Sequence, residues 1–230
     1  MTTYPWPAVL PAARVAFNPR GMTVAGPATL TGQSQVLSTD AGYWVATLEL
    51  ATLTKGAPVN AFRALRAKLE GGAHQVLVPV FDTGDDDNGQ VPWPSAGGRA
   101  ANANAELPWS GGGSFFWDDG HGWFNPKIVV AAAAAAAAGA TVVDVAVTTA
   151  GTISEGMKFG IGDRLYVLRE MLSPTRWAIW PKLREAVALG AEIRFENPVC
   201  KMRLMREDDM DLALGRRWVA NPSIGLIESF

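Results

Sequence analysis

Residues 176–205, RWAIWPKLREAVALGAEIRFENPVCKMRLM, decide the fold of this chain. Their pattern predicts a strand, a sharp Trp-Pro turn, a polar crossing, a second strand, a proline break and a third strand. The charged residues that alternate with apolar ones in it are Lys182, Arg184, Glu185, Glu192, Arg194 and Glu196. We interpret this stretch as a small β-domain that closes and returns the chain to a larger one. That arrangement is typical of a structural building block, and nothing in the stretch indicates a catalytic centre.

The composition indicates a globular chain with little charge. Its 230 residues suffice for one large or two modest domains, and 48% are apolar against 18% charged, which excludes disorder. A formal charge of −2 provides no basic field for nucleic acid and no polybasic membrane anchor. We therefore expect no nucleic-acid readout, and we interpret the low charge as a sign that neighbouring subunits cover part of the surface.

Three local features bear on compartment. Cys200 is the single cysteine, so no intrachain disulfide can form, and we expect it to be a small buried side chain in a strand. The first residues lack the basic segment and apolar run of a signal peptide. The longest apolar run, residues 128–138, is too short to span a bilayer. These features predict a soluble protein made in the cytoplasm.

The first half of the chain predicts strands and one helix. Residues 1–32 are rich in proline and predict an extended arm with edge strands. Residues 33–38 and 43–53 predict a strand pair joined by a turn at 39–42. Residues 58–70 predict a helix that packs through Val59, Phe62, Leu65 and Leu69 and ends at two glycines. Residues 74–81 predict a strand that Pro79 confines to an edge or a bulge.

The second half begins with a long loop, residues 82–125, which is dense in glycine and aromatic residues and is expected to be functional or ordered on assembly. The alanine run in residues 127–140 favours a helix by propensity, although its flanking valines also permit a strand. Five short strands between residues 141 and 197 predict a compact β-barrel. Residues 199–230 are expected to return to the first sheet and complete it.

These elements define the expected fold class, which is mainly β (α+β). We expect a β-sandwich-like domain with one helix, built from residues 1–126 and 199–230 and carrying the loop 82–125. A small OB-like or SH3-like β-barrel, residues 127–198, is expected as an insertion that interrupts it.

The candidate functional residues are expected to form an interface between subunits, because aromatic and arginine side chains dominate such contacts. They are Trp6, Arg63, Arg66, Trp93, Trp109, Phe116, Trp117 and Trp123. The same aromatics in the long loop are also compatible with stacking on a sugar, which leaves a carbohydrate-binding or host-adhesion module as the alternative.

We expect this chain to have no catalytic residue, no cofactor and no metal site. Asp118, Asp119 and His121 are the only group that suggests a hydrolase, and two histidines and one cysteine are too few for a zinc site. The acidic residues at 82–88 resemble a calcium loop, but the Glu and Gly of that loop are missing from their places. We interpret them as a solvated turn.

Four stretches carry a resemblance to a known family. They are Tyr4-Pro5-Trp6-Pro7, the strand and helix YWVATLEL (43–50) and VNAFRALRAKLEGG (59–72), the strand HQVLVPVFD (74–82), and IGDRLYVL (161–168) with residues 176–205. In these stretches and in the order of its parts, the chain resembles tail proteins of long-tailed (siphovirus-like) bacteriophages and prophages, and distal tail proteins in particular.

The resemblance implies a non-enzymatic protein of the virion tail tip. It implies a ring, expected to be a hexamer of this chain, that joins the tail tube protein to the hub or baseplate and to the fibre proteins. The N-terminal arm, sheet edges and loops would hold that ring together, with the barrel projecting outwards. Another minor tail or tail-terminator protein is a second possibility within the same class.

Overall fold

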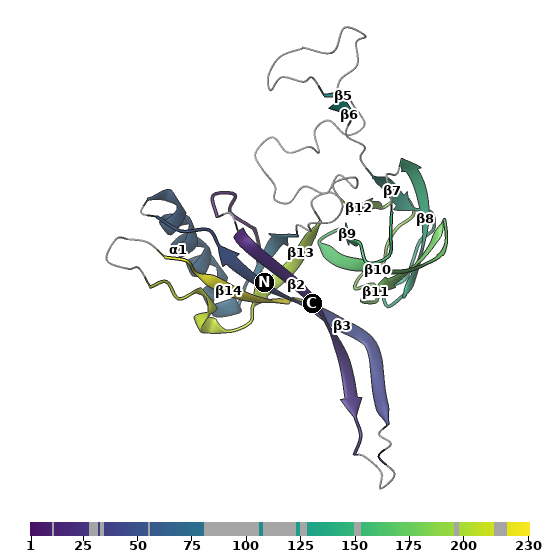
Figure 1. The fold of residues 1–230 in the computed structure, drawn as a ribbon, viewed down its shortest axis with the longest axis horizontal. Helices are drawn as coiled ribbons and strands as arrows, with labels where there is room; N and C mark the ends of the chain where they lie inside the picture. Colours follow the sequence, from purple (N-terminus) through teal and green to yellow (C-terminus); the bar gives the residue numbers. More distant parts are fainter. Residues whose placement is uncertain are drawn as a thin grey trace.

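The computed structural model describes residues 1–10, 12–27, 32, 35–54, 56–80, 106–107, 123–124, 128–149, 153–195, 198–213 and 220–230. Its strands form a six-stranded sheet, a closed six-stranded barrel and a separate pair, β5 (Glu106–Leu107) with β6 (Trp123–Phe124) (Figure 1). The described residues contain one α-helix. The expected fold class is therefore confirmed: mainly β, with a sheet-based, sandwich-like part and a small β-barrel.

The sheet contains the first and last strands of the chain. Its order is β1 (Thr3–Pro5), β4 (Gln75–Pro79), β13 (Val199–Leu204), β14 (Ser223–Glu228), β3 (Val36–Leu50) and β2 (Ala12–Ala25). Only β1 and β4 pair in parallel. As predicted, the tail of the chain returns to this sheet, since β13 and β14 lie between β4 and β3.

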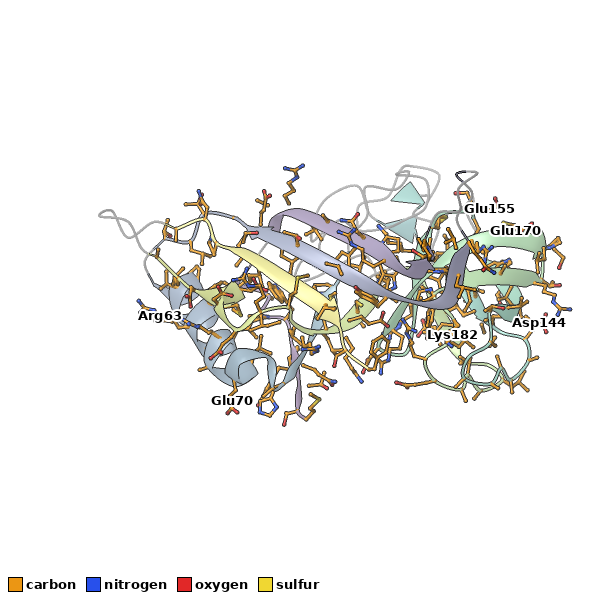
Figure 2. All side chains as sticks on the ribbon, turned by 90° about the horizontal axis from the view of Figure 1, so that it is seen from below. Arg63, Glu70, Asp144, Glu155, Glu170 and Lys182 are labelled. Carbon is orange, nitrogen blue, oxygen red and sulfur yellow. The ribbon has the colours of Figure 1, made fainter. Side chains whose placement is uncertain are left out.

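Helix α1 (Ala57–Leu69) covers one face of the sheet (Figure 2). The four side chains that it buries are those predicted from its periodicity: Val59, Phe62, Leu65 and Leu69. They pack with inward-facing residues of the strands, among them Trp44 and Leu48. The helix ends at Glu70, whose backbone is left-handed, and continues into the 3₁₀ turn η1 (Glu70–Gly72).

The barrel closes in the order β10 (Arg164–Ser173), β11 (Arg176–Trp180), β8 (Val142–Thr149), β7 (Val129–Ala132), β12 (Glu192–Arg194) and β9 (Lys158–Ile161). Five of these strands match the five predicted ones. An aromatic cluster fills the interior, with Phe159 lying 5.4 Å from Phe195 and 6.4 Å from Trp177 between ring centroids. Cys200 is buried in β13, as predicted, and burial raises the pKa of its thiol well above the usual value.

The expectation of a helix in the alanine run is wrong. The run provides the sixth barrel strand, β7, and then continues as turns and an isolated bridge between Ala136 and Val187. Several of its amides donate to distant barrel residues: Ala133 N donates to Asp144 O at 2.8 Å and Ala136 N donates to Val187 O at 2.9 Å. The helix preference of alanine amounts to under ~1 kcal/mol per residue, and these long-range partners override it.

The expected turn at residues 39–42 is also wrong, because β3 runs through it as one strand paired with β2. Arg20 pairs with Tyr43, whereas Met22 pairs with Thr39. Three residues of β3, 40–42, therefore lie opposite the single Gly21. Turn-forming residues have produced a β-bulge, which bends a strand without reversing it. The predicted edge strands of the N-terminal arm are confirmed, since β1 and β2 form the two edges of the sheet.

Strand β4 is neither at an edge nor bulged, contrary to both alternatives expected from Pro79, and its register with its two neighbours has no shift. It lies between β1 and β13. Strand β1 pairs only with residues 75–77, so Pro79 lies beyond it and its missing N–H leaves no ladder bond unmade on that side.

Strand β10 of the barrel packs against the core of the sheet, and a buried ion pair joins the two parts. Leu165 on β10 packs in the core of the sheet, while its neighbours Tyr166 and Leu168 pack inside the barrel. Trp44 Nε1 donates to Leu165 O at 2.8 Å. Arg184 Nε and Nη2 donate to the two Glu228 carboxylate oxygens at 2.9 and 3.0 Å, and these side chains are only 8% and 1% exposed.

The ion pair has further hydrogen-bond partners in both parts of the molecule. Trp44 N donates to Glu228 Oε2 at 3.0 Å, and Arg184 also donates to Gly42 O in the bulge. Beside it, Arg164 donates to Ser229 O and pairs with Glu185. A buried charge is tolerated only with such partners. The pair therefore connects the barrel, through Arg184, to β3 and β14 of the sheet.

We predict that Glu228→Ala lowers the free energy of unfolding by about 3–5 kcal/mol, because it leaves the Arg184 guanidinium buried without its counter-charge. Urea unfolding, followed by circular dichroism, measures the change. The matched control is Glu49→Ala, whose pair with Arg14 is exposed and spans 4.0 Å, so that at most about 1 kcal/mol is expected. Equal losses for the two variants would contradict the structural role of the pair.

We predict that Gly42→Ala costs about 1–3 kcal/mol by overpacking. A Cβ at residue 42 would enter the Trp180 ring, which is itself packed edge-on against Trp44 at 6.0 Å. Near-ultraviolet circular dichroism of the two tryptophans and urea unfolding check this. Gly21→Ala is the control, since a Cβ there meets no atom within 4 Å. An unchanged midpoint for Gly42→Ala would show that residue 42 has room for a side chain.

Candidate assembly surface

The hairpin tip, residues 22–25 paired with residues 36–39, extends away from both the sheet and the barrel (Figure 1). Val36 and Leu37 on its β3 strand are 58% and 65% exposed. Successive residues of a strand point to opposite faces, so apolar surface is exposed on both faces of this ribbon. A two-stranded ribbon without a covered face is marginally stable in water at best. The tip therefore has the properties of a surface that is completed by a partner.

The edge of β2 is protected unevenly. On the part of β2 that belongs to the sheet, Arg14, Pro19 and Arg20 are exposed, and charges and proline are the usual protection of an open edge against pairing. Beyond Arg20 this protection ends, because the sequence has no charged residue until Asp40. The unprotected part of the edge coincides with the hairpin tip.

A groove lies where the hairpin leaves the body of the protein. We call it the junction groove; its volume is about 480 Å³. The lining residues are Pro19 and Gly21 of β2, Val167, Leu168 and Arg169 of β10, Trp180 of β11, and Gly156. Trp180 is held in place by its contacts with Trp44 and with the bulge at Gly42. Both parts of the molecule therefore build this groove, and the buried ion pair maintains its shape.

The residues predicted for the interface do not gather in one place. Trp6 is half-buried and packs against its own sheet core, with Nε1 donating to Leu10 O at 2.9 Å. Arg63 and Arg66 are exposed on α1, where Arg66 pairs with Asp211 (Figure 2 labels Arg63). They line a second groove, of about 290 Å³, against Leu204 and Glu207.

The other predicted interface residues belong to the long loop. Trp93, Trp109, Phe116 and Trp117 lie outside the described residues. Trp123 pairs with Leu107 through the β5–β6 backbone, and its side chain is not among those described. The alternative site residues Asp118, Asp119 and His121, and the acidic stretch 82–88, also lie outside the described part.

Two titratable groups of the described residues, His74 and Tyr166, have structural partners. His74 accepts a hydrogen bond from Thr2 N at 3.2 Å and lies 3.6 Å from Glu70. Burial raises the pKa of the Tyr166 hydroxyl, which accepts a hydrogen bond from Arg184 N at 3.1 Å. Among the described side chains, no three His, Cys, Asp or Glu residues come together as metal ligands would. No helix of the described residues has the length and hydropathy of a membrane span.

Comparison with known proteins finds no matching family model and no significantly similar curated protein. Sequence reasoning missed both the hairpin tip and the junction groove. The uncharged run between Arg20 and Asp40 was the available signal for the tip, because few surface segments of this length lack charge. The groove had no local signal, since its walls are far apart in sequence.

We predict that Leu37→Asn leaves the stability of the single chain unchanged to within about 0.5 kcal/mol, because the Leu37 side chain is 65% exposed. Urea unfolding of dilute protein measures this. Leu48→Asn, at a fully buried position of the same strand, is the comparison and should cost several kcal/mol, roughly 2–5. A large loss for Leu37→Asn in dilute solution would mean that the tip packs on its own chain.

Proposed function

We propose that this chain is a structural protein of a phage tail tip, which assembles into a ring between the tail tube and the hub, baseplate and fibres. The observation that carries the proposal is the hairpin tip, an uncharged ribbon with apolar side chains exposed on both faces. Exposed apolar surface of this kind marks a protein–protein contact.

A ring is favoured because the two edges of the sheet differ from each other. The sheet ends in a long edge strand, β2, on one side and in the three-residue β1 on the other. A surface on one side of a subunit that meets a different surface of the next gives a heterologous contact, which forms a closed ring when the rotation closes. The resemblance of residues 4–7, 43–50, 59–72, 74–82, 161–168 and 176–205 to tail-tip proteins assigns this ring to a virion.

The buried ion pair and the packing of β10 against the core of the sheet support the same function. A connector must keep its parts at fixed angles while force passes through it. Arg184 and Glu228 join through two parallel hydrogen bonds, a geometry that fixes orientation as well as distance. In this proposal the barrel is held rigidly on the ring-forming sheet.

We predict that the purified protein forms a closed ring. Light scattering should give a mass several times that of the 24.5-kDa chain, with six chains weighing about 147 kDa. Negative-stain images should show a central opening of tail-tube width. The ring should also co-sediment with assembled tail-tube protein.

A protein that stays monomeric at high concentration, and that also fails to bind tail tubes, would contradict the proposal. If that monomer bound bacterial surface glycans on an array, the adhesion module would replace the ring as its function.

A further inference from the structure

We propose that within the ring the hairpin tip of one copy packs into the junction groove of the next copy. This inference rests on the proposed function and deepens it, because it names the two surfaces that meet. The tip is the projecting apolar feature of the described molecule, and the groove is an apolar hollow at the base of the same hairpin.

A chain cannot fill its own groove. Leu37 pairs with Val24, three residues beyond Gly21 of the groove wall, and three residues of strand span about 10 Å. The ladder of paired residues holds this short ribbon extended, and it leads away from the sheet and from the barrel strands that line the groove (Figure 1). The groove can receive the tip of another copy only.

The chemistry of the groove suits a strand. Trp180, Val167 and Pro19 offer apolar surface to side chains such as Val36 and Leu37. Arg169 is the one charged residue of the lining, and its side chain is exposed. A guanidinium has five N–H donors and no acceptor, and the unpaired carbonyls of an incoming ribbon edge are suitable acceptors.

The placement of the two surfaces favours a ring. Tip and groove are different patches, so each copy gives a tip to one neighbour and receives one from the other. When the rotation between neighbouring copies adds up to a full turn, these contacts form a closed ring in which every tip is covered. The same surfaces would also permit two copies to exchange tips in a symmetrical dimer, and the experiment must distinguish this dimer from the ring.

Cross-linking tests the contact directly. A variant with Leu37→Cys is mixed with a second variant carrying Arg169→Cys, assembled, and treated with a short bis-maleimide. Both positions are exposed, whereas the native Cys200 is fully buried and will not react. We expect cross-linked dimers from the mixture. As a control, Leu37→Cys is mixed with Leu189→Cys, a position that is 69% exposed on the barrel and away from the groove lining, and this pair should not cross-link.

A chain carrying both Leu37→Cys and Arg169→Cys separates ring from exchange. A ring gives a ladder of products up to the full number of subunits. Products that stop at the dimer would overturn the ring contact in favour of symmetrical exchange.

Two blocking variants test the energetics. Leu37→Asp removes the apolar side chain of the tip, and Gly21→Phe adds a large side chain to the groove wall at a position where an added Cβ meets no atom within 4 Å. Each should raise the concentration for half-assembly about 10- to 100-fold, the range for a central interface residue. Leu189→Asp and Ala188→Phe carry the same changes on the exposed barrel surface and should assemble normally.

The outcomes distinguish this inference from the proposed function. Rings that persist in both blocking variants, without the predicted cross-link, would refute the tip-in-groove contact and leave the ring intact. A wild-type protein that never assembles would refute the ring and, with it, this contact.

Discussion

The bidentate pair of Arg184 and Glu228 is the interaction on which the arrangement of this molecule depends. It lies where the crossing from the barrel, strand β14 and the bulge of β3 meet, and each polar atom that it brings out of water finds a partner there. Replacing both residues by apolar ones of similar volume would conserve much of the stability, since burying two charges is itself costly. Such a replacement would lose the fixed orientation of the barrel relative to the sheet, because a packed apolar contact tolerates rotations that two parallel hydrogen bonds do not. The pair therefore contributes more to fixing the angle between barrel and sheet than to the stability of the fold.

The junction groove lies between these two parts, so its shape depends on the angle between the barrel and the sheet. One wall comes from β2 and another from β10 and β11, and Trp180 reaches across to the bulge at Gly42. The bulge has two effects: it accepts a hydrogen bond from Arg184 through Gly42 O, and it bends the ribbon so that the hairpin tip leaves the body of the molecule. Groove and tip are thus placed by the same few residues, although they are different surfaces.

The sequence was most informative where local pattern decides the structure. The 3.6-residue period of α1, the barrel strands and the crossing from barrel to sheet in residues 176–205 were all predicted, because alternating apolar residues leave little choice of buried face. The prediction from sequence was wrong where residues far apart in the chain determine the local structure. The alanine run became a strand because Asp144 and Val187 accept from its amides, and Asp40-Ala41-Gly42 became a bulge because β2 continues to pair beyond them. Arg184 looked like any other charge of an alternating surface, since nothing in its neighbourhood reveals that Glu228 lies opposite.

An exposed, uncharged ribbon is a hazard in a single chain, because it can pair with any open strand edge. Strand β2 keeps proline and arginine on the part of its edge that belongs to the sheet and none on the part that projects. The boundary falls at Arg20, directly before the bulge. If the whole edge were a liability, protection would be expected along its entire length. In the ring that we propose, the projecting part is the one that pairs, and closure satisfies every such edge without leaving one at the end of a growing filament.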